Sequence, residues 1–428
     1  MYAGFEHVNA LLTEGAGVAM CWDGSPIRWR PFDPDDVEWR RERNTDVRVL
    51  RVAVPEDDEF LRGLVRWRDW LQDYGASLLA SIGSTSHGLL RATIDRPIWL
   101  NTAYPDSVVP PLHTLIGGRQ LGGLKPLRVR KPTGGEIRNY DLPAAYATLL
   151  GTLPYGRGWL ELPASDCGDD FLDKWNGVTP AFATARVSIP PMGLGPLPER
   201  PSAKYNQKFW FDLTEYPVDS TIRGLWTIAE LKEAVAVGCD VQLRNVWLQV
   251  ANSTPPFAPW FDAVKEGRRM RGFAGTLAKM TGNSLWGQFA ISPKSQKTIR
   301  WKDNGKFEHK RIPYTTAPRA LDIAEHLTGT VRAQLFRFAI QAGEKLITAH
   351  TDGAWVKWEP GDEYEGWRVK MRTPEFRYLS PQMYSYHYRK GNVYKTAAFP
   401  RASAKEVFEE RWRRAGGGER GRSDRFAG

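Results

Sequence analysis

A β-hairpin predicted around residue 352 is the feature that most restricts how this chain of 428 residues can fold. Residues 345–349 have the composition of a strand, His350–Gly353 supply the turn, and residues 355–358 form the strand that leaves. A hairpin requires antiparallel pairing, and it puts Asp352 at its tip. A second short strand, Ile137–Asp141, also ends on an acid. The sequence therefore predicts an antiparallel sheet with carboxylates at strand ends.

Helical patterns alternate with such strands, which favours an α+β fold. The helix at 227–237 has the clearest start, because Thr227 and Glu230 have the spacing of a capping box. Residues 151–205, rich in Gly and Pro, are expected to form a loop-rich insert. The other predicted helices are 60–74, 321–342 and a basic helical stretch at 261–284 that Gly272, Gly275 and Gly282 interrupt. The other predicted strands are 47–54 and 241–250.

Charge and composition narrow the class of partner. Lys and Arg number 59 against 49 Asp and Glu, a net charge of +10, which favours a polyanion such as nucleic acid or an anionic membrane. No apolar stretch approaches the ~18 residues of a membrane span, and the first ten residues lack a signal-peptide pattern. The three cysteines lie far apart, which disfavours a zinc ribbon or a disulfide framework. We therefore expect a cytoplasmic protein that binds nucleic acid and no membrane.

The two strand-end acids, Asp141 and Asp352, have the chemistry of a divalent-metal site. Two carboxylates that meet at a sheet edge can hold two ions ~3.5–4 Å apart, which clamp the attacking and leaving oxygens of a phosphoryl transfer. Magnesium suits such a site, because it takes its remaining ligands from water and phosphate, with manganese as the alternative ion. The competing interpretation is that each Asp only begins a turn, the commoner role of a single Asp.

A basic helical face supplies the second candidate. Lys279 and Asn283 are four residues apart, so they share a helix face, and Arg268 lies three turns earlier on nearly the same face. Such a stripe can hold a triphosphate and a sugar or base edge, although a solvated basic face is the usual reason for charge on a helix. The glycines at 282 and 287 indicate close backbone approach, either to a ligand or to a packed neighbour.

Taken together, three segments resemble motifs A, B and C of family B DNA polymerases. Asp141–Ala147 (DLPAAYA) resembles motif A, D-x-x-S-L-Y-P, and residues 279–287 (KMTGNSLWG) resemble motif B, K-x-x-x-N-S-x-Y-G. His350–Gly353 (HTDG) resembles motif C, D-T-D-S, with Asp352 retained and His350 in place of the first Asp. Flanking segments add to the resemblance, which covers about residues 110–405 and leans toward the protein-primed phage and plasmid branch.

The resemblance implies an α+β right-hand polymerase with an antiparallel-sheet palm, helical fingers, a minimal thumb and a small N-terminal domain. The implied divisions are 1–110 for the N-terminal domain, degenerate or unrelated to an exonuclease, 111–225 for the connector and palm with an insert, 226–295 for the fingers, 296–375 for the palm with motif C, and 376–428 for a reduced thumb and basic tail.

The resemblance also implies a role for individual residues. Asp141, Asp352 and Lys279 would be catalytic, with Asp141, Asp352 and the Leu142 carbonyl as metal ligands. Nucleotide would be bound by Leu142, Tyr146 (the steric gate against a 2′-OH), Arg268, Lys279, Asn283 and Trp286. Contacts to DNA would come from the G-G-R connector, Gly117, Gly118 and Arg119, and from the K-x-Y region, Gln382, Tyr384 and Lys395.

The implied function is a DNA-directed DNA polymerase that adds deoxynucleotides to a 3′-OH, with template-primer DNA, deoxynucleoside triphosphates and a priming or processivity protein as partners. Proofreading is expected to be absent, because the one D-x-E sequence before the connector, Asp57–Glu59, follows Pro55 in an acidic turn. A primase-like initiator is an alternative within the same class. An alternative of another class is a catalytically weakened relative that keeps the fold for binding nucleic acid, since His350 replaces a carboxylate.

Overall fold

The computed structural model describes helices and antiparallel sheets over a large part of the chain. The described residues are 16–21, 28–31, 47–50, 58–77, 82–94, 136–167, 170–199, 216–251, 254–289, 297–301, 307–311, 320–350, 352–380, 383–388, 391–396 and 404–414. Every strand pairing within these ranges is antiparallel, as the sequence predicts.

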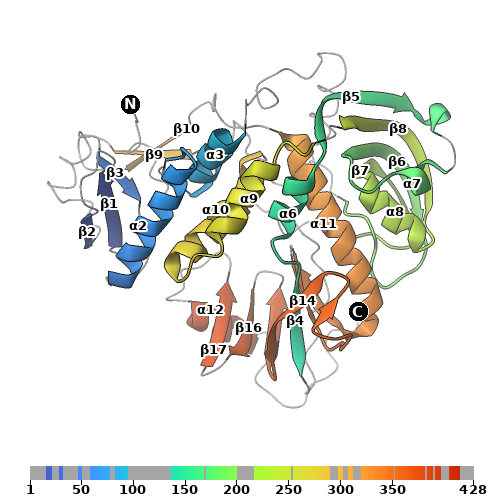
Figure 1. Ribbon diagram of the computed structural model, residues 1–428. Helices are drawn as coiled ribbons and strands as arrows, with labels where there is room; N and C mark the ends of the chain where they lie inside the picture. Colours follow the sequence, from blue (N-terminus) through green and yellow to red (C-terminus); the bar gives the residue numbers. More distant parts are fainter. Residues whose placement is uncertain are drawn as a thin grey trace.

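A five-stranded sheet in the order β11-β12-β4-β14-β13 forms the lower part of the molecule (Figure 1). Its strands are β11 (Leu346–His350), β12 (Gly353–Val356), β4 (Ile137–Asp141), β14 (Trp367–Thr373) and β13 (Glu363–Tyr364). The predicted hairpin is confirmed as β11 and β12. Helix α11 (Leu321–Ala342) packs on this sheet, with Phe338 among the rings of Tyr140 and Trp367.

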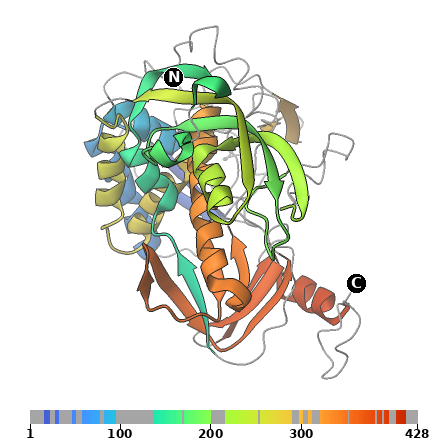
Figure 2. The same cartoon turned by 90° about the vertical axis from the view of Figure 1, so that its right-hand side faces the viewer.

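A four-stranded sheet, β5-β8-β6-β7, lies on the other side of α11 (Figure 2). It comprises β5 (Tyr155–Pro163), β8 (Asp240–Ala251), β6 (Ala181–Ile189) and β7 (Ser220–Thr227), and α8 (Ile228–Ala236) packs against it. The capping box of Thr227 and Glu230 is confirmed. The loop-rich insert expected at 151–205 is wrong for β5 and β6, because apolar side chains buried along β6 make it a core strand. The expected division between residues 225 and 226 falls inside β7.

Five helices share one hydrophobic core with the first turns of α11, above the five-stranded sheet. They are α2 (Asp58–Asp73), α3 (Ile82–Thr93), α6 (Ala145–Thr152), α9 (Ala258–Gly267) and α10 (Phe273–Phe289). The helical stretch expected at 261–284 is interrupted at Gly272, which has a φ of 70° and directly precedes α10, but α10 continues through Gly275 and Gly282. Gly282 lies against Val264, where an added Cβ would come within 2.5 Å, so this glycine serves helix packing.

A smaller three-stranded sheet and a helix are the last described elements of the chain. It contains β15 (Phe376–Ser380), β16 (Met383–Tyr388) and β17 (Gly391–Thr396), with α12 (Ala404–Arg414) against it. Arg377 pairs with Glu409 and lies over the rings of Phe408 and Trp412, which fixes α12 to the sheet. The remaining described elements are β1 (Ala16–Cys21), β2 (Arg28–Pro31), β3 (Val47–Leu50), β9 (Lys297–Trp301), β10 (Phe307–Arg311), η1 (Ala164–Asp166), α7 (Phe171–Lys174) and η3 (Gly343–Lys345).

Within the described ranges, none of the helices combines the length and the apolar character needed to cross a membrane.

Candidate functional site

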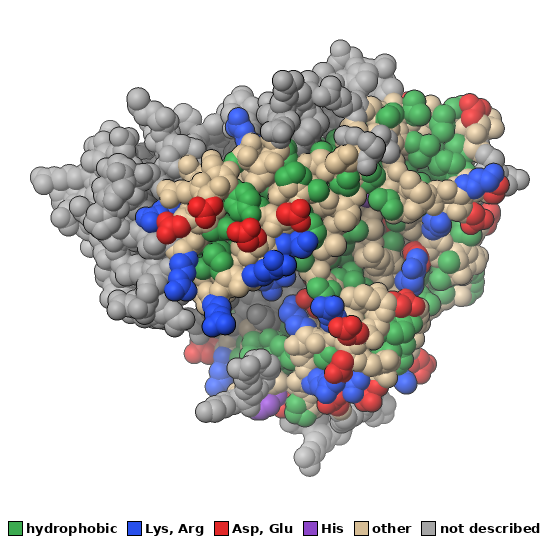
Figure 3. All heavy atoms as spheres, viewed as in Figure 1, with side chains coloured by type: hydrophobic (Ala, Val, Ile, Leu, Met, Phe, Trp, Pro, Cys, Tyr) green, Lys and Arg blue, Asp and Glu red, His purple; other side chains and the backbone are tan. Residues whose placement is uncertain are grey.

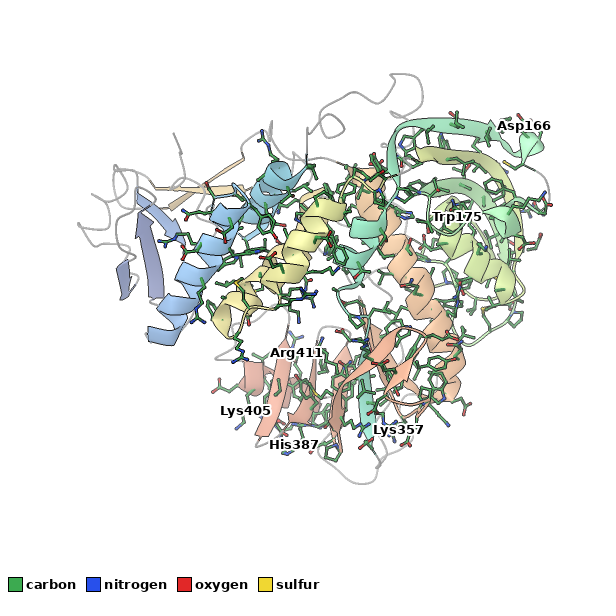
Figure 4. All side chains as sticks on the ribbon, in the orientation of Figure 1. Asp166, Trp175, Lys357, His387, Lys405 and Arg411 are labelled. Carbon is green, nitrogen blue, oxygen red and sulfur yellow. The ribbon has the colours of Figure 1, made fainter. Side chains whose placement is uncertain are left out.

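Asp141 and Asp352 lie side by side where two neighbouring strands of the five-stranded sheet, β4 and β12, meet end to start. We call this end of the strands the sheet edge. Asp141 ends β4, and its pairing partner on β12 is Gly353, the residue after Asp352. The N–H of Leu142 donates to the carbonyl of Asp352 at 2.9 Å, which joins the two strand ends directly. Although 211 positions of sequence separate them, antiparallel pairing brings the two acids together. Lys357, labelled in Figure 4, marks the opposite end of β12.

The donor set at this edge suits a hard divalent cation. It comprises two carboxylates and the carbonyl of Leu142, all of them oxygen, which Mg²⁺ and Mn²⁺ accept. The Leu142 carbonyl already accepts the N–H of Ala145 at 3.3 Å, and its second lone pair remains for another partner. Within the described ranges no three His, Cys, Asp or Glu side chains group as a metal cluster, so an ion here would need ligands from water or substrate as well.

Tyr146 connects these acids to α10. Its ring stacks on Trp286 with centroids 4.9 Å apart and planes 20° apart. Burial, followed by the negative charge of Asp352, raises the pKa of Tyr146 above its ordinary value. The Tyr146–Trp286 stack therefore joins residues 141–147 to α10, and the Leu142–Asp352 hydrogen bond joins them to Asp352.

The stack also orients α10. Lys279, Asn283 and Trp286 follow the i, i+4, i+7 spacing of one helix face, and Lys279 and Asn283 are exposed. Because Trp286 contacts Tyr146, this face is directed to the side of the helix on which the two acids lie. Figure 3 shows a hollow below α9 and α10 with Lys and Arg side chains along its border.

Arg268 does not lie on the helix face that was predicted for it. It is the C-cap of α9, so it does not share a helix with Lys279, and the argument from a common helix face is wrong. The chain from Arg268 to Met270 instead folds over the start of α10, where a Cβ on Gly275 would come within 2.1 Å of the Met270 carbonyl. Arg268 is half-buried, and Arg269 and Arg271 beside it are exposed.

Sequence reasoning missed one residue of the site. The ammonium of Lys370 on β14 contacts Oδ2 of Asp141 at 3.0 Å. A basic residue on a strand gives no local signal of such a contact, because its partner lies 229 positions earlier. The contact depends on the pairing of β14 with β4.

The predicted DNA contacts are mostly not described. Gly117, Gly118, Arg119 and Gln382 lie outside the described residues. Lys395 on β17 and His350 on β11 have a described backbone only. Tyr384 on β16 is half-buried beside the rings of Trp355, Phe376 and Tyr386, and burial raises its pKa to about 12.

A second charged cluster, of Arg332, Glu230 and Glu325, is buried. Arg332 on α11 donates to Oε1 of Glu230 at 2.8 Å and to Oε1 of Glu325 at 2.5 Å. Burial alone would raise the pKa of Glu230, but Arg332 and the hydrogen bonds of Thr227 hold it below its ordinary value. Burial would also lower the pKa of Arg332, which the two glutamates instead raise. The positive charge of Arg332 also opposes part of the rise in the pKa of Tyr146.

Comparisons with known proteins identify a similar fold. The phi29 DNA polymerase complex with primer-template DNA and incoming nucleotide substrates gives a TM-score of 0.59 at 18% identity, over 79% of this chain and 64% of that chain. An orthorhombic crystal form of phi29 DNA polymerase gives 0.60 at 17% identity, over 82% and 65%. The phi29 complex with single-stranded DNA gives 0.58 at 17%, over 82% and 64%.

This chain therefore spans just under two thirds of the phi29 chains, and at this identity the likeness establishes the fold. No protein-family model matches the sequence, and no curated protein matches it.

Proposed function

We propose that this protein is a template-directed DNA polymerase that adds deoxynucleotides to a 3′-OH by two-metal-ion phosphoryl transfer, without proofreading. The observation that carries the proposal is the meeting of Asp141 and Asp352 at one sheet edge, beside a Tyr146–Trp286 stack that connects them to the Lys279 face of α10. The likeness of the fold to phi29 DNA polymerase supports it. The proposal includes no proofreading, because Asp58 and Glu59 of the D-x-E sequence begin α2 and so do not lie in a strand.

In this proposal the five-stranded sheet is the palm, α9 and α10 are the fingers, and the three-stranded sheet with α12 is a reduced thumb. The helices α2 and α3 lie against α10 and share its core, so the described part of the N-terminal domain supports the fingers. Template-primer DNA would occupy the hollow between fingers and palm, where the basic residues provide the electrostatic attraction that any phosphate backbone requires.

The residues would divide the work of the reaction as follows. Asp141, Asp352 and the Leu142 carbonyl would hold two Mg²⁺ or Mn²⁺ ions. When bound, such ions neutralise charge that develops on the attacking and leaving oxygens. Lys279 and Arg268 would bind the triphosphate and draw charge from the pyrophosphate. Catalysis by these side chains is then positioning and charge compensation.

The remaining predicted residues would select the substrate. Tyr146 is held flat against Trp286, so its ring has one fixed position from which to exclude a 2′-OH. Asn283, one turn before Trp286 on the same face, would contact the incoming nucleotide, and Trp286 the nascent pair. The contacts proposed for Gly117, Gly118, Arg119, Gln382, Tyr384 and Lys395 are to DNA, and a priming or processivity protein remains a proposed partner.

Primer extension with Mg²⁺ or Mn²⁺ tests the proposal, with wild type compared against Asp352→Asn. We expect extension by wild type and a loss of about 10³-fold in the variant, because charge neutralisation by the metals is worth several kcal/mol. Asp166→Asn is the matched control, since Asp166 lies at the outer end of β5 (Figure 4). No extension by wild type in either metal would overturn the polymerase proposal.

A second candidate function is binding of nucleic acid without catalysis. Two observations favour it: His350 stands where the family has an acid, and Lys370 contacts Asp141. This candidate predicts retained primer-template binding by wild type and Asp352→Asn alike, with no extension by either. Labelling of a protein by a deoxynucleotide, or synthesis on an unprimed template, would identify a protein-primed or primase-like initiator.

A further inference from the structure

Lys370 occupies an unusual place in β14. Arg368 pairs with Asp141 and Val369 with Tyr140, but the next pairing joins Met371 to Asn139. Lys370 is therefore the extra residue of a β-bulge. Bulges change the direction in which a side chain points, and they are common beside active sites. Here the bulge coincides with the one residue of β14 whose side chain contacts Asp141.

The contact uses one of the two oxygens of Asp141. Oδ2 accepts the Lys370 ammonium at 3.0 Å. Oδ1 faces the backbone of Gly353, where an added Cβ would lie 3.4 Å from it. The Asp141 side chain is 23% exposed and that of Lys370 is 50% exposed, so the pair is open to exchange with ions from solvent.

We propose that Lys370 is a resident counter-ion of Asp141 which a divalent metal must displace, and that it thereby sets the metal affinity of the site. The inference rests on the metal site of the proposed function. An ammonium and a divalent cation that share one carboxylate repel each other, so occupancy by the metal requires the ammonium to move away. Lys370 is a positioning residue in this scheme, because it acts through Asp141.

Removal of the ammonium should therefore tighten metal binding. Lys370→Met is expected to lower the Kd for Mn²⁺ by about two- to fivefold, the range that corresponds to a partly exposed ion pair. Lys370→Glu adds a carboxylate beside Asp141 and is expected to lower the Kd by about tenfold. Both differences should shrink when the salt concentration is raised, because salt screens exposed charges.

The experiment is a titration of Mn²⁺ into the full chain without DNA or nucleotide, with free Mn²⁺ followed by electron paramagnetic resonance. Arg368→Met is the matched control, because it removes one positive charge from the same strand, where the Arg368 guanidinium forms an ion pair with Glu363 at 3.1 Å although its backbone is the register partner of Asp141. Lys370→Gln serves as a second neutral variant, and circular dichroism checks that each protein is folded.

The outcomes distinguish the role of Lys370 from the metal site of the proposed function. Tighter binding by Lys370→Met and Lys370→Gln than by wild type and Arg368→Met supports the role of Lys370. Unchanged or weaker binding in the two neutral variants overturns that role, while loss of binding in Asp352→Asn would still support the metal site. Equal binding by wild type and Asp352→Asn, or no binding by wild type, overturns the metal site and the inference with it.

Discussion

The structure contains two pairs of carboxylates, one sealed and one open. Glu230 and Glu325 share the guanidinium of Arg332, and the side chains of Glu230 and Arg332 are 1% and 3% exposed. Asp141 and Asp352 stand at a sheet edge, where Asp141 contacts an ammonium that is itself half exposed. The same chemical group therefore serves packing in one place and remains accessible to cations in the other.

The difference follows from what each location can offer. A buried carboxylate is stable only when it is paired and hydrogen-bonded, so Glu230 is held by Arg332 from a second helix and by Thr227 from its own cap, while Glu325 is held by Arg332 from the same helix. At the sheet edge, water and an exposed lysine are sufficient to stabilise a charged carboxylate, because it remains partly solvated. The electrostatic interactions there are weaker. We therefore expect changes in the sealed cluster to appear as stability and changes at the open edge to appear as binding and activity.

The largest effect on stability is expected from Arg332→Met. It leaves Glu230 and Glu325 buried without a counter-charge, which typically costs about 3–5 kcal/mol. Asp352→Asn should change the free energy of unfolding by less than ~1 kcal/mol, because its surroundings include solvent. Urea denaturation measures both values. Similar losses in the two variants would break the distinction between sealed and open acids.

A smaller effect is expected from His326, which is buried on α11 next to Glu325. Burial lowers the pKa of His326 to about 4, and the nearby Asp322 opposes this shift only in part. The unfolded chain, with a His pKa of ~6.5, takes up the proton first, so stability present above pH 6.5 is lost as the pH falls toward 4.

Wild type should accordingly lose about 2 kcal/mol more than His326→Leu between pH 7 and pH 4.5. Urea denaturation over a pH series checks this value. If the free energy of unfolding falls equally with pH in the two proteins, groups other than His326 cause the loss of stability in acid.

At the open edge, Trp286→Leu should lower stability by about 1 kcal/mol, the usual worth of an aromatic pair. It should also reduce discrimination against ribonucleotides, because the Tyr146 ring loses its support. Trp412→Leu is the matched control, since Trp412 stacks on Phe408 at a similar angle in α12. Measurements are urea denaturation and the ratio of deoxynucleotide to ribonucleotide incorporation. An equal change of that ratio in both variants would contradict the role of the stack.

The smallest effect is expected from Ala144→Gly. Ala144 begins α6 with φ 54° and ψ 34°, a left-handed conformation that costs a residue with a Cβ about 1–2 kcal/mol. Glycine relieves this strain but loses more entropy on folding, so a net gain of about 0.5 kcal/mol is expected. Asp219→Gly, at φ 48°, should gain less because Asp tolerates this region better. Thermal unfolding measures both variants, and a loss of stability in Ala144→Gly would count against strain at this turn.

Where contacts are local, the sequence was sufficient to predict structure. The capping box of Thr227 and Glu230 needs only residues three positions apart, and the β11–β12 hairpin needs only neighbouring strands. The shared face of Lys279 and Asn283 follows in the same way from helix geometry. The face assigned to Arg268 was wrong because it assumed that one helix continued through residues 268–272.

Tertiary structure alone decided which of these groups meet. Glu230 acquires Arg332 from 102 positions away, and Asp141 acquires Lys370 from 229 positions away through a bulge that shifts one strand by a residue. The physical reason is the range of the forces. Propensity and capping act within a turn or two of chain, so the sequence alone indicates which elements form and which acids end them. Packing and strand register set which charge lies beside each acid, and so which acid is sealed and which is open to solvent.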